Sequence, residues 1–319
     1  MIRALVVGLG LLLLAFFLVT NSWWGDGPIE EETVVVVEEG TSIAGLGQQL
    51  ANDGQIAMSP DRWRLLARVL GGSDPIRTGE FAIPAAASPA DILDIVQHAT
   101  PVQRMVTIPE GLPSVLVQEK LQAAPHLVGE APLPPEGSVL PDTYSYQRGE
   151  TREAVLARMT AAMDEALKEL WPTRSKTSVV TTPQEAVTLA SVVEKETAKA
   201  DERPMVAGVL SNRVRLGMKL GADATTIYPI TKGRPLGRMI RKSELADPNP
   251  YNTRAIAGLP AGPITNPGVD ALKAVLAPAE TDALYYVADG SGGHVFAKTL
   301  AEHNENAARW RALRKKRGK

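Results

Sequence analysis

The first 24 residues constrain this chain more than any other segment. Seventeen residues without a charge, Ala4–Thr20, follow Arg3. A helix over Ala4–Trp24 would be roughly 31 Å long at about 1.5 Å per residue, which matches the hydrocarbon thickness of a bilayer. We therefore expect residues 1–24 to form a cytoplasmic tip and a single-pass transmembrane anchor.

The charges on either side of the apolar segment predict its orientation. Arg3 precedes it, whereas residues 25–32 form an acidic linker without Lys or Arg. The positive-inside rule places Arg3 in the cytoplasm and the rest of the chain outside it, and Trp23 and Trp24 suit the far interface. The alternative is a cleaved signal peptide, but such a peptide ends in a small-x-small site. Here the apolar run ends in Asn, Ser and two Trp.

Composition excludes several classes of protein. The absence of cysteine excludes disulfides, iron–sulfur clusters, cysteine-ligated zinc and thiol nucleophiles. With 34 Lys+Arg against 36 Asp+Glu, the net charge of −2 does not indicate a nucleic-acid-binding protein. The segment Arg309–Lys319 carries seven basic residues and no acid, which leaves −9 for the rest of the chain. It is either a solvated helix end or a contact for anionic lipid or cell-wall polymer.

The pattern of apolar residues predicts an α+β fold with a small module before a larger domain. Residues 33–100 have a β-α-α-β pattern followed by one more helix. The expected elements are strands at 33–37 and 77–83 and helices at 43–52, 60–70 and 90–99. Residues 101–319 form the larger domain. Its stretch 217–267 is rich in Gly, Pro, Asn and Asp, and an irregular stretch of this length usually builds a site or a lid.

Common catalytic patterns are missing from the sequence. The four histidines have no ligand spacing such as HExxH, and no GxSxG motif occurs. The run Gly290–Gly293 lacks the GK[ST] ending of a phosphate loop and is better interpreted as a β-hairpin turn. We therefore expect no metal site and no cofactor.

One carboxylate lies where an amphipathic helix should be apolar. At about 100° per residue, Glu196 falls in the middle of the stripe formed by Leu189, Val192 and Val193. Burial disfavours the ionised form and raises the pKa, as a general acid requires. The alternative is a structural ion pair between Glu196 and an arginine such as Arg203 or Arg213.

Several strings of residues in this order carry a resemblance to a known family. They are Val106–Gly111, Pro141–Tyr144, Ala190–Thr197 (Ala-Ser-Val-Val-Glu-Lys-Glu-Thr), Glu202–Pro204, Asn212–Met218, Pro250–Thr253, Gly258–Gly268 and Tyr286–Phe296. Together they resemble the YceG-like family of endolytic murein transglycosylases over essentially the whole chain. The family usually has a Gln and Asp-Pro-Thr where this chain has Leu220–Thr226. Asp223 and Thr225 match this pattern, whereas its Gln and Pro are missing, and these two differences concern substrate contacts on that loop.

The resemblance implies an architecture and an activity. It implies an inner-membrane protein with a LysM-like module at 33–100 and a periplasmic catalytic domain at 101–319. It also implies cleavage of the β-1,4 bond between N-acetylmuramic acid and N-acetylglucosamine in peptidoglycan, with 1,6-anhydro ends as products. Peptidoglycan synthases would be partners.

The catalytic glutamate of the family matches Glu196. Hydrogen-bonding residues expected to orient the substrate are Glu202, Asn212, Arg213, Asp223, Thr225, Tyr251 and Asn252. Each of these could instead be structural; Arg213, for example, could pair with Glu202. A muramidase with Asp223 or Glu202 as second carboxylate and a non-catalytic glycan-binding scaffold are the alternatives.

Overall fold

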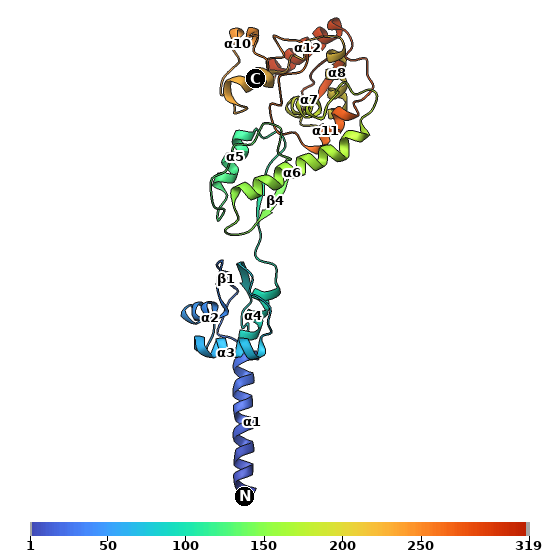
Figure 1. Cartoon of the computed structure of the whole chain (residues 1–319). Helices are drawn as coiled ribbons and strands as arrows, with labels where there is room; N and C mark the ends of the chain where they lie inside the picture. The colour runs from blue at the N-terminus through green and yellow to red at the C-terminus, as the bar shows by residue number, and fades with distance from the viewer. Residues whose placement is uncertain (1, 317–319) are drawn as a thin grey trace. The chain divides into compact units, whose positions relative to one another are not determined.

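The computed structural model describes residues 2–316, so the last three residues of the basic tail lie outside the described part (Figure 1). The chain divides into two compact units. Unit 1 comprises residues 1–104 and 145–149, and unit 2 comprises residues 105–144 and 150–319. The mixed helix and strand content agrees with the expected α+β class.

Unit 1 has the predicted β-α-α-β order, preceded by one long helix. Its elements are α1 (Ile2–Trp24), β1 (Thr33–Val37), α2 (Ile43–Asn52), α3 (Pro60–Leu70), β2 (Gly79–Ile83) and α4 (Pro89–His98). Strands β1 and β2 are antiparallel. The hydroxyls of Ser42, Ser59 and Ser88 each accept a backbone N–H in the first turn of the following helix, which fixes where α2, α3 and α4 begin. The relation of this unit to a LysM module stays a prediction.

Two tryptophans join α1 to the core of unit 1. Trp23 and Trp63 are both fully buried, and their ring centroids are 5.5 Å apart. The indole Nε1 of Trp63 donates to the carbonyl of Ile43 at 3.1 Å. Over Val6–Trp24, helix α1 is long and apolar enough to cross a membrane. The last turn of this candidate span is therefore part of a folded unit.

Unit 2 is mostly helical. Its elements are β3 (Arg104–Thr107), α5 (Ser114–Ala123), β4 (Thr143–Tyr146), α6 (Arg152–Leu170), η1 (Trp171–Thr173), α7 (Pro183–Glu196), η2 (Ala200–Glu202), α8 (Arg203–Arg215), α9 (Asp223–Thr231), α10 (Lys242–Ala246), α11 (Val269–Leu276), β5 (Tyr285–Ala288), β6 (His294–Ala297) and α12 (Leu300–Lys316). The first residue of β3 belongs to unit 1, as do the last two of β4. Strands β3 and β4 pair, and so do β5 and β6. The segment between β5 and β6 is the hairpin turn predicted from its glycines.

Helix α7 is the centre of unit 2. It packs against α8, α9 and α11, of which α8 and α11 are labelled beside it in Figure 1, and every residue from Ala186 to Val193 is buried. The sequence predicts one apolar face, whereas the structure buries all faces. This is possible because the two polar residues of the run are satisfied inside the helix: Thr188 donates to the carbonyl of Gln184 and Ser191 to that of Thr188.

Two helices lie in a stretch that the sequence predicts to be irregular. The stretch 217–267 contains α9 and α10. Helix α9 holds Pro229 in its interior, and a proline there normally signals the end of a helix. Helix α7 ends at Glu196, where Thr197 takes an extended backbone conformation.

Two glycines in α2 allow a matched test of the unit 1 core. A Cβ on Gly47 would overlap the indole ring of Trp63, whereas a Cβ on Gly45 would meet the Ser42 hydroxyl at an ordinary 3.5 Å. We expect Gly47→Ala to destabilise unit 1 by about 1–3 kcal/mol through overpacking. Gly45→Ala should stabilise it by about 0.5–1 kcal/mol through helix propensity.

Urea unfolding of the full chain in detergent, followed by tryptophan fluorescence, measures both changes. Equal unfolding midpoints for the two variants would contradict the packing described for α2 and α3.

Candidate active site

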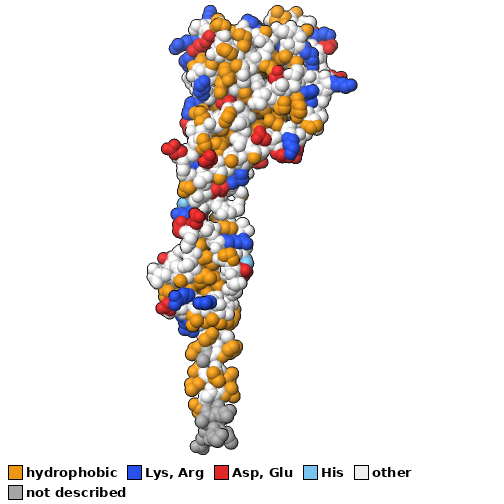
Figure 2. Space-filling view, in the orientation of Figure 1, with side chains coloured by type: hydrophobic (Ala, Val, Ile, Leu, Met, Phe, Trp, Pro, Cys, Tyr) orange, Lys and Arg blue, Asp and Glu red, His pale blue; other side chains and the backbone are white. Residues whose placement is uncertain are grey.

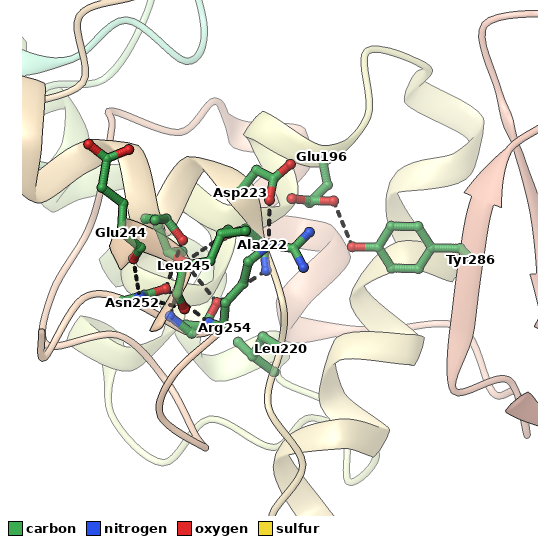
Figure 3. A network of polar contacts seen from close by, with 12 residues as sticks. Glu196, Leu220, Ala222, Asp223, Glu244, Leu245, Asn252, Arg254 and Tyr286 are labelled. Atoms are coloured by element: carbon green, nitrogen blue, oxygen red, sulfur yellow. Dashed lines mark hydrogen bonds and ion pairs between the residues drawn. The ribbon is translucent and has the colours of Figure 1, made fainter. Parts of the chain in front are cut away.

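Glu196 is the last residue of α7. Helix α7 begins with Pro183 after Thr182, whose hydroxyl accepts the N–H of Glu185, and it is held on all sides by the unit 2 core. The half-buried carboxyl of Glu196 accepts a hydrogen bond at Oε2 from the hydroxyl of Tyr286 at 2.7 Å (Figure 3). Among residues 2–316, Glu196 forms no ion pair. Its position is set by the helix and by this one tyrosine.

The surroundings of Glu196 favour its protonated form. Burial is the main cause, and it raises the pKa of the Glu196 carboxyl above its ordinary value. The hydrogen bond from Tyr286 opposes this rise, whereas the negative charge of Asp223 adds to it. The charges of His294 and Arg254 also lower the pKa, but the net direction is upward. A raised pKa favours the protonated carboxyl, which is the form that a general acid uses.

Tyr286 comes from β5 and remains a hydrogen-bond donor. Burial and the neighbouring Glu196 raise the pKa of its hydroxyl well above the ordinary value for tyrosine. Its ring lies edge-on to the imidazole of His294, with centroids 5.3 Å apart, and also contacts Phe296. Because both neighbours are on β6, the β5–β6 hairpin holds Tyr286 in place.

Glu202 is joined to the same hairpin. Its carboxylate accepts the backbone N–H of His294 at 3.0 Å and the ring Nδ1 at 2.8 Å. Burial alone would raise the pKa of Glu202, but the hydrogen bonds from His294 outweigh it and lower the pKa. Since a carboxylate only accepts, Nδ1 carries the proton in this contact. The alternative in which Glu202 pairs with Arg213 is wrong.

Asp223 and Arg254 form an ion pair on the other side of Glu196 from Tyr286. The Nε of Arg254 donates to Oδ1 of Asp223, and both side chains are exposed (Figure 3). Asp223 opens helix α9, which gives it a place at the positive end of a helix dipole. The site therefore has a half-buried side around Glu196, where the protonated carboxyl is favoured, and a charged, solvent-accessible side around Asp223.

Two further predicted residues hold the start of α9. Thr225 is fully buried, and its hydroxyl contacts that of Thr253 at 2.8 Å. Asn252 is also buried; its amide donates to the carbonyls of Glu244 and Asp247, at 3.0 and 2.8 Å. These bonds fix the backbone next to Asp223 and Arg254. Substrate contact by Thr225 and Asn252 stays a prediction.

Asn212 and Arg213, on α8, hold the segment that leads into β5. The amide of Asn212 donates to the carbonyl of Thr281 at 2.7 Å, and Nε of Arg213 donates to that of Leu284 at 2.6 Å. Both bonds position the strand that carries Tyr286. Tyr251 lies apart from these residues, with its ring 4.9 Å from that of Tyr228. For these three residues too, substrate contact stays a prediction.

The structural ion pair considered for Glu196 is wrong, because Arg203 has other partners. Its Nη2 bonds Glu110 at 2.8 Å and Glu194 at 3.1 Å. The second oxygen of Glu194 accepts the N–H of Gly268 at 3.0 Å. This cluster ties the Pro-Glu-Gly turn at Glu110 to the end of α7.

Sequence reasoning missed Tyr286, Arg254 and His294 as parts of the site. They lie tens of residues from Glu196 along the chain, and only the fold brings them together. The string Tyr286–Phe296, quoted above for its resemblance, was the available signal for two of them. Among residues 2–316, no three His, Cys, Asp or Glu side chains gather as metal ligands would.

Named relatives match part of this chain. An endolytic murein transglycosylase from Streptococcus pneumoniae serotype 2 (strain D39) is 37% identical over 180 residues, which cover 54% of this chain and 32% of the relative. An endolytic murein transglycosylase from Bacillus subtilis (strain 168) is 33% identical over 172 residues, covering 54% of this chain and 47% of the relative. The chain thus spans less than half the length of these relatives.

A solved structure and a family match cover more of the chain. The crystal structure of a YceG-like protein from Listeria monocytogenes superposes with a TM-score of 0.54 at 24% identity, covering 86% of this chain and 99% of that one, so the two share a fold. The YceG-like family matches residues 35–309, a range that includes Glu196, Asp223 and Tyr286. The chain belongs to the YceG-like family.

Proposed function

We propose that this chain is an endolytic lytic transglycosylase of peptidoglycan. It cleaves the β-1,4 bond between N-acetylmuramic acid and N-acetylglucosamine and leaves 1,6-anhydro ends. The observation that carries the proposal is the Glu196 carboxyl, which has a raised pKa and lies between Tyr286 and Asp223 at the end of a buried helix. The names of the two relatives described above support the same reaction class.

In the first step, protonated Glu196 acts as general acid. It gives its proton to the glycosidic oxygen while the bond from C1 of the muramic residue to that oxygen breaks, and an oxocarbenium-like centre develops at C1. The raised pKa keeps the proton on Glu196 until it is transferred. As negative charge develops on the carboxylate, the hydrogen bond from Tyr286 stabilises it.

In the second step, the same carboxylate acts as base. It takes the proton from the C6 hydroxyl of the muramic residue, and the C6 oxygen bonds to C1 of that residue. The nucleophile belongs to the reacting sugar, so its effective concentration is high and no water needs activation. Glu196 ends protonated and ready for another cycle, and one carboxylate suffices.

The two carboxylates considered as second catalytic groups are already engaged. Glu202 accepts two hydrogen bonds from His294, and Asp223 is paired with Arg254. This supports a single-carboxylate reaction over the muramidase alternative, which needs a second carboxylate as nucleophile or base. The scaffold alternative gives no reason for a half-buried glutamate with a raised pKa.

The placement in the cell is part of the proposal. Helix α1 anchors the chain in the inner membrane, and the rest of unit 1 lies in the periplasm together with unit 2. Cleavage of nascent strands there would terminate their elongation, and peptidoglycan synthases are the proposed partners. Seven residues would line or support the glycan site: Glu202, Asn212, Arg213, Asp223, Thr225, Tyr251 and Asn252.

The role of Glu196 can be tested by an isosteric change. Glu196→Gln removes the transferable proton and should lower turnover of purified peptidoglycan by at least about 10²-fold, without changing the thermal unfolding midpoint. The control is Glu185→Gln, the same change in the first turn of α7, where the side chain accepts hydrogen bonds from Thr181; this variant should keep wild-type activity.

Mass spectrometry of the fragments tests the reaction type. Wild-type fragments should lack one water relative to hydrolytic products. Ordinary reducing ends would favour the muramidase, and binding without cleavage would favour the scaffold.

Tyr286→Phe should shift the basic limb of the pH profile of kcat/KM to higher pH. The tyrosine hydroxyl favours the ionised form of Glu196, so its removal raises the pKa of the carboxyl. Activity requires protonated Glu196 and falls as pH rises through this pKa, so the basic limb moves to higher pH. Tyr285→Phe is the control, because the Tyr285 ring contacts His303 and Arg213. An unshifted limb in Tyr286→Phe would remove the tyrosine from the proposed site.

Asp223→Asn should shift the same limb in the opposite direction. The negative charge of Asp223 raises the pKa of Glu196, and its loss also leaves the positive charge of Arg254 uncompensated. Both changes lower the pKa of Glu196, so activity should be lost at a lower pH. Asp282→Asn, at an exposed aspartate paired with Lys298, is the control. A shift to higher pH in Asp223→Asn would contradict the electrostatics described here.

A further inference from the structure

Helix α3 of unit 1 has a second apolar row in addition to the face that it buries. Trp63, Leu66 and Ala67 form the buried face. Leu65 and Val69 are 60% and 68% exposed and, being four residues apart, lie next to each other on the helix surface. Together they form a contiguous apolar patch on the surface, and such a patch can mark a contact with a membrane or another protein.

The exposed row lies at the end of the candidate membrane span. The Nη2 of Arg62 donates to the hydroxyl of Ser22 at 2.8 Å and to the carbonyl of Leu18 at 3.4 Å. On a helical wheel Arg62 is adjacent to Leu65 and Val69. Figure 1 shows α3 beside the end of α1, and Figure 2 shows hydrophobic and basic side chains gathered in unit 1 near that end.

The charges of α3 suit a lipid surface. Arg62, Arg64 and Arg68 are exposed, and the one acidic residue of the helix, Asp61, pairs with Arg64 at 3.5 Å. Arginine can place its stem along apolar groups while its guanidinium reaches phosphates. An apolar row flanked by arginines is the pattern of a helix that lies in the membrane interface, and anionic lipids strengthen its binding.

Trp23 and Trp24 indicate that the membrane–water interface lies at the level of α3. Trp24 is 54% exposed, and tryptophan favours the boundary between acyl chains and headgroups. Trp23, its neighbour in sequence, is buried against Trp63 of α3. Since α1 enters the core of unit 1 through Trp23, a bilayer around α1 would meet the adjoining surface of α3.

We propose that α3 lies in the headgroup region of the membrane that α1 spans, with Leu65 and Val69 at the acyl boundary and Arg62 and Arg68 at lipid phosphates. The proposal rests on the proposed anchoring by α1. It makes unit 1 a module docked on the lipid surface, held by α1 and α3 together.

The absence of cysteine permits a direct test on the full chain. Single variants Leu65→Cys and Val69→Cys carry a nitroxide label in nanodiscs that contain one copy of the chain and phosphatidylglycerol. Leu12→Cys, in exposed α1, is the reference for lipid, and Val34→Cys, 49% exposed on β1, is the reference for water. The measurement is the accessibility of each label to oxygen and to a water-soluble nickel complex.

The expected result is that the labels at positions 65 and 69 favour oxygen over nickel, as the label at position 12 does, whereas the label at position 34 favours nickel. If positions 65 and 69 match position 34 while position 12 remains in lipid, the docking of α3 is wrong and the anchor stands. If position 12 is in water as well, the anchor and the docking are both wrong. Protection that appears only in discs with two copies, with spin–spin broadening, would assign the face to a second copy and overturn the proposal.

Discussion

The burial of α7 is the constraint on which the candidate site depends. A helix enclosed from Ala186 to Val193 cannot rotate or shift without disturbing three neighbouring helices. The position of its last residue, Glu196, is therefore fixed, although this residue lies at the edge of the core. The hydrogen bond from Tyr286 then sets the direction of the carboxyl. Precision at this site comes from core packing, because close-packed interiors resist displacement.

The polar residues around the site form a supporting frame of backbone contacts. Asn212 and Arg213 hold the approach to β5, and Thr225 and Asn252 hold the start of α9. Tyr286 lowers the pKa of Glu196 and Asp223 raises it. Each of these two residues thus lies on a segment that is fixed by such contacts. Side chains whose polar groups bond to carbonyls in this way order the site even where they touch no sugar.

Much of this arrangement could be predicted from local patterns, and some of it could not. The βααβ order of unit 1, the hairpin turn before His294 and the unusual position of Glu196 follow from periodicity and turn residues, which are local properties. Helix α9 was missed because Pro229 hides its pattern. Arg254 and Tyr286 were missed because no local rule joins residues 58 and 90 positions away from Glu196; only tertiary packing does.

A raised pKa alone would not single out Glu196. Burial also raises the pKa of Glu194 and of Glu136. The oxygens of Glu194 are taken by Arg203 and the N–H of Gly268, and Glu136 accepts the N–H of Ser114 at 2.8 Å.

Within residues 2–316, Glu196 accepts a hydrogen bond at Oε2 and none at Oε1. It also has the exposed Asp223–Arg254 pair beside it. A carboxyl can transfer a proton only if an oxygen can reach a substrate, and this condition separates Glu196 from the other two more sharply than any shift in pKa.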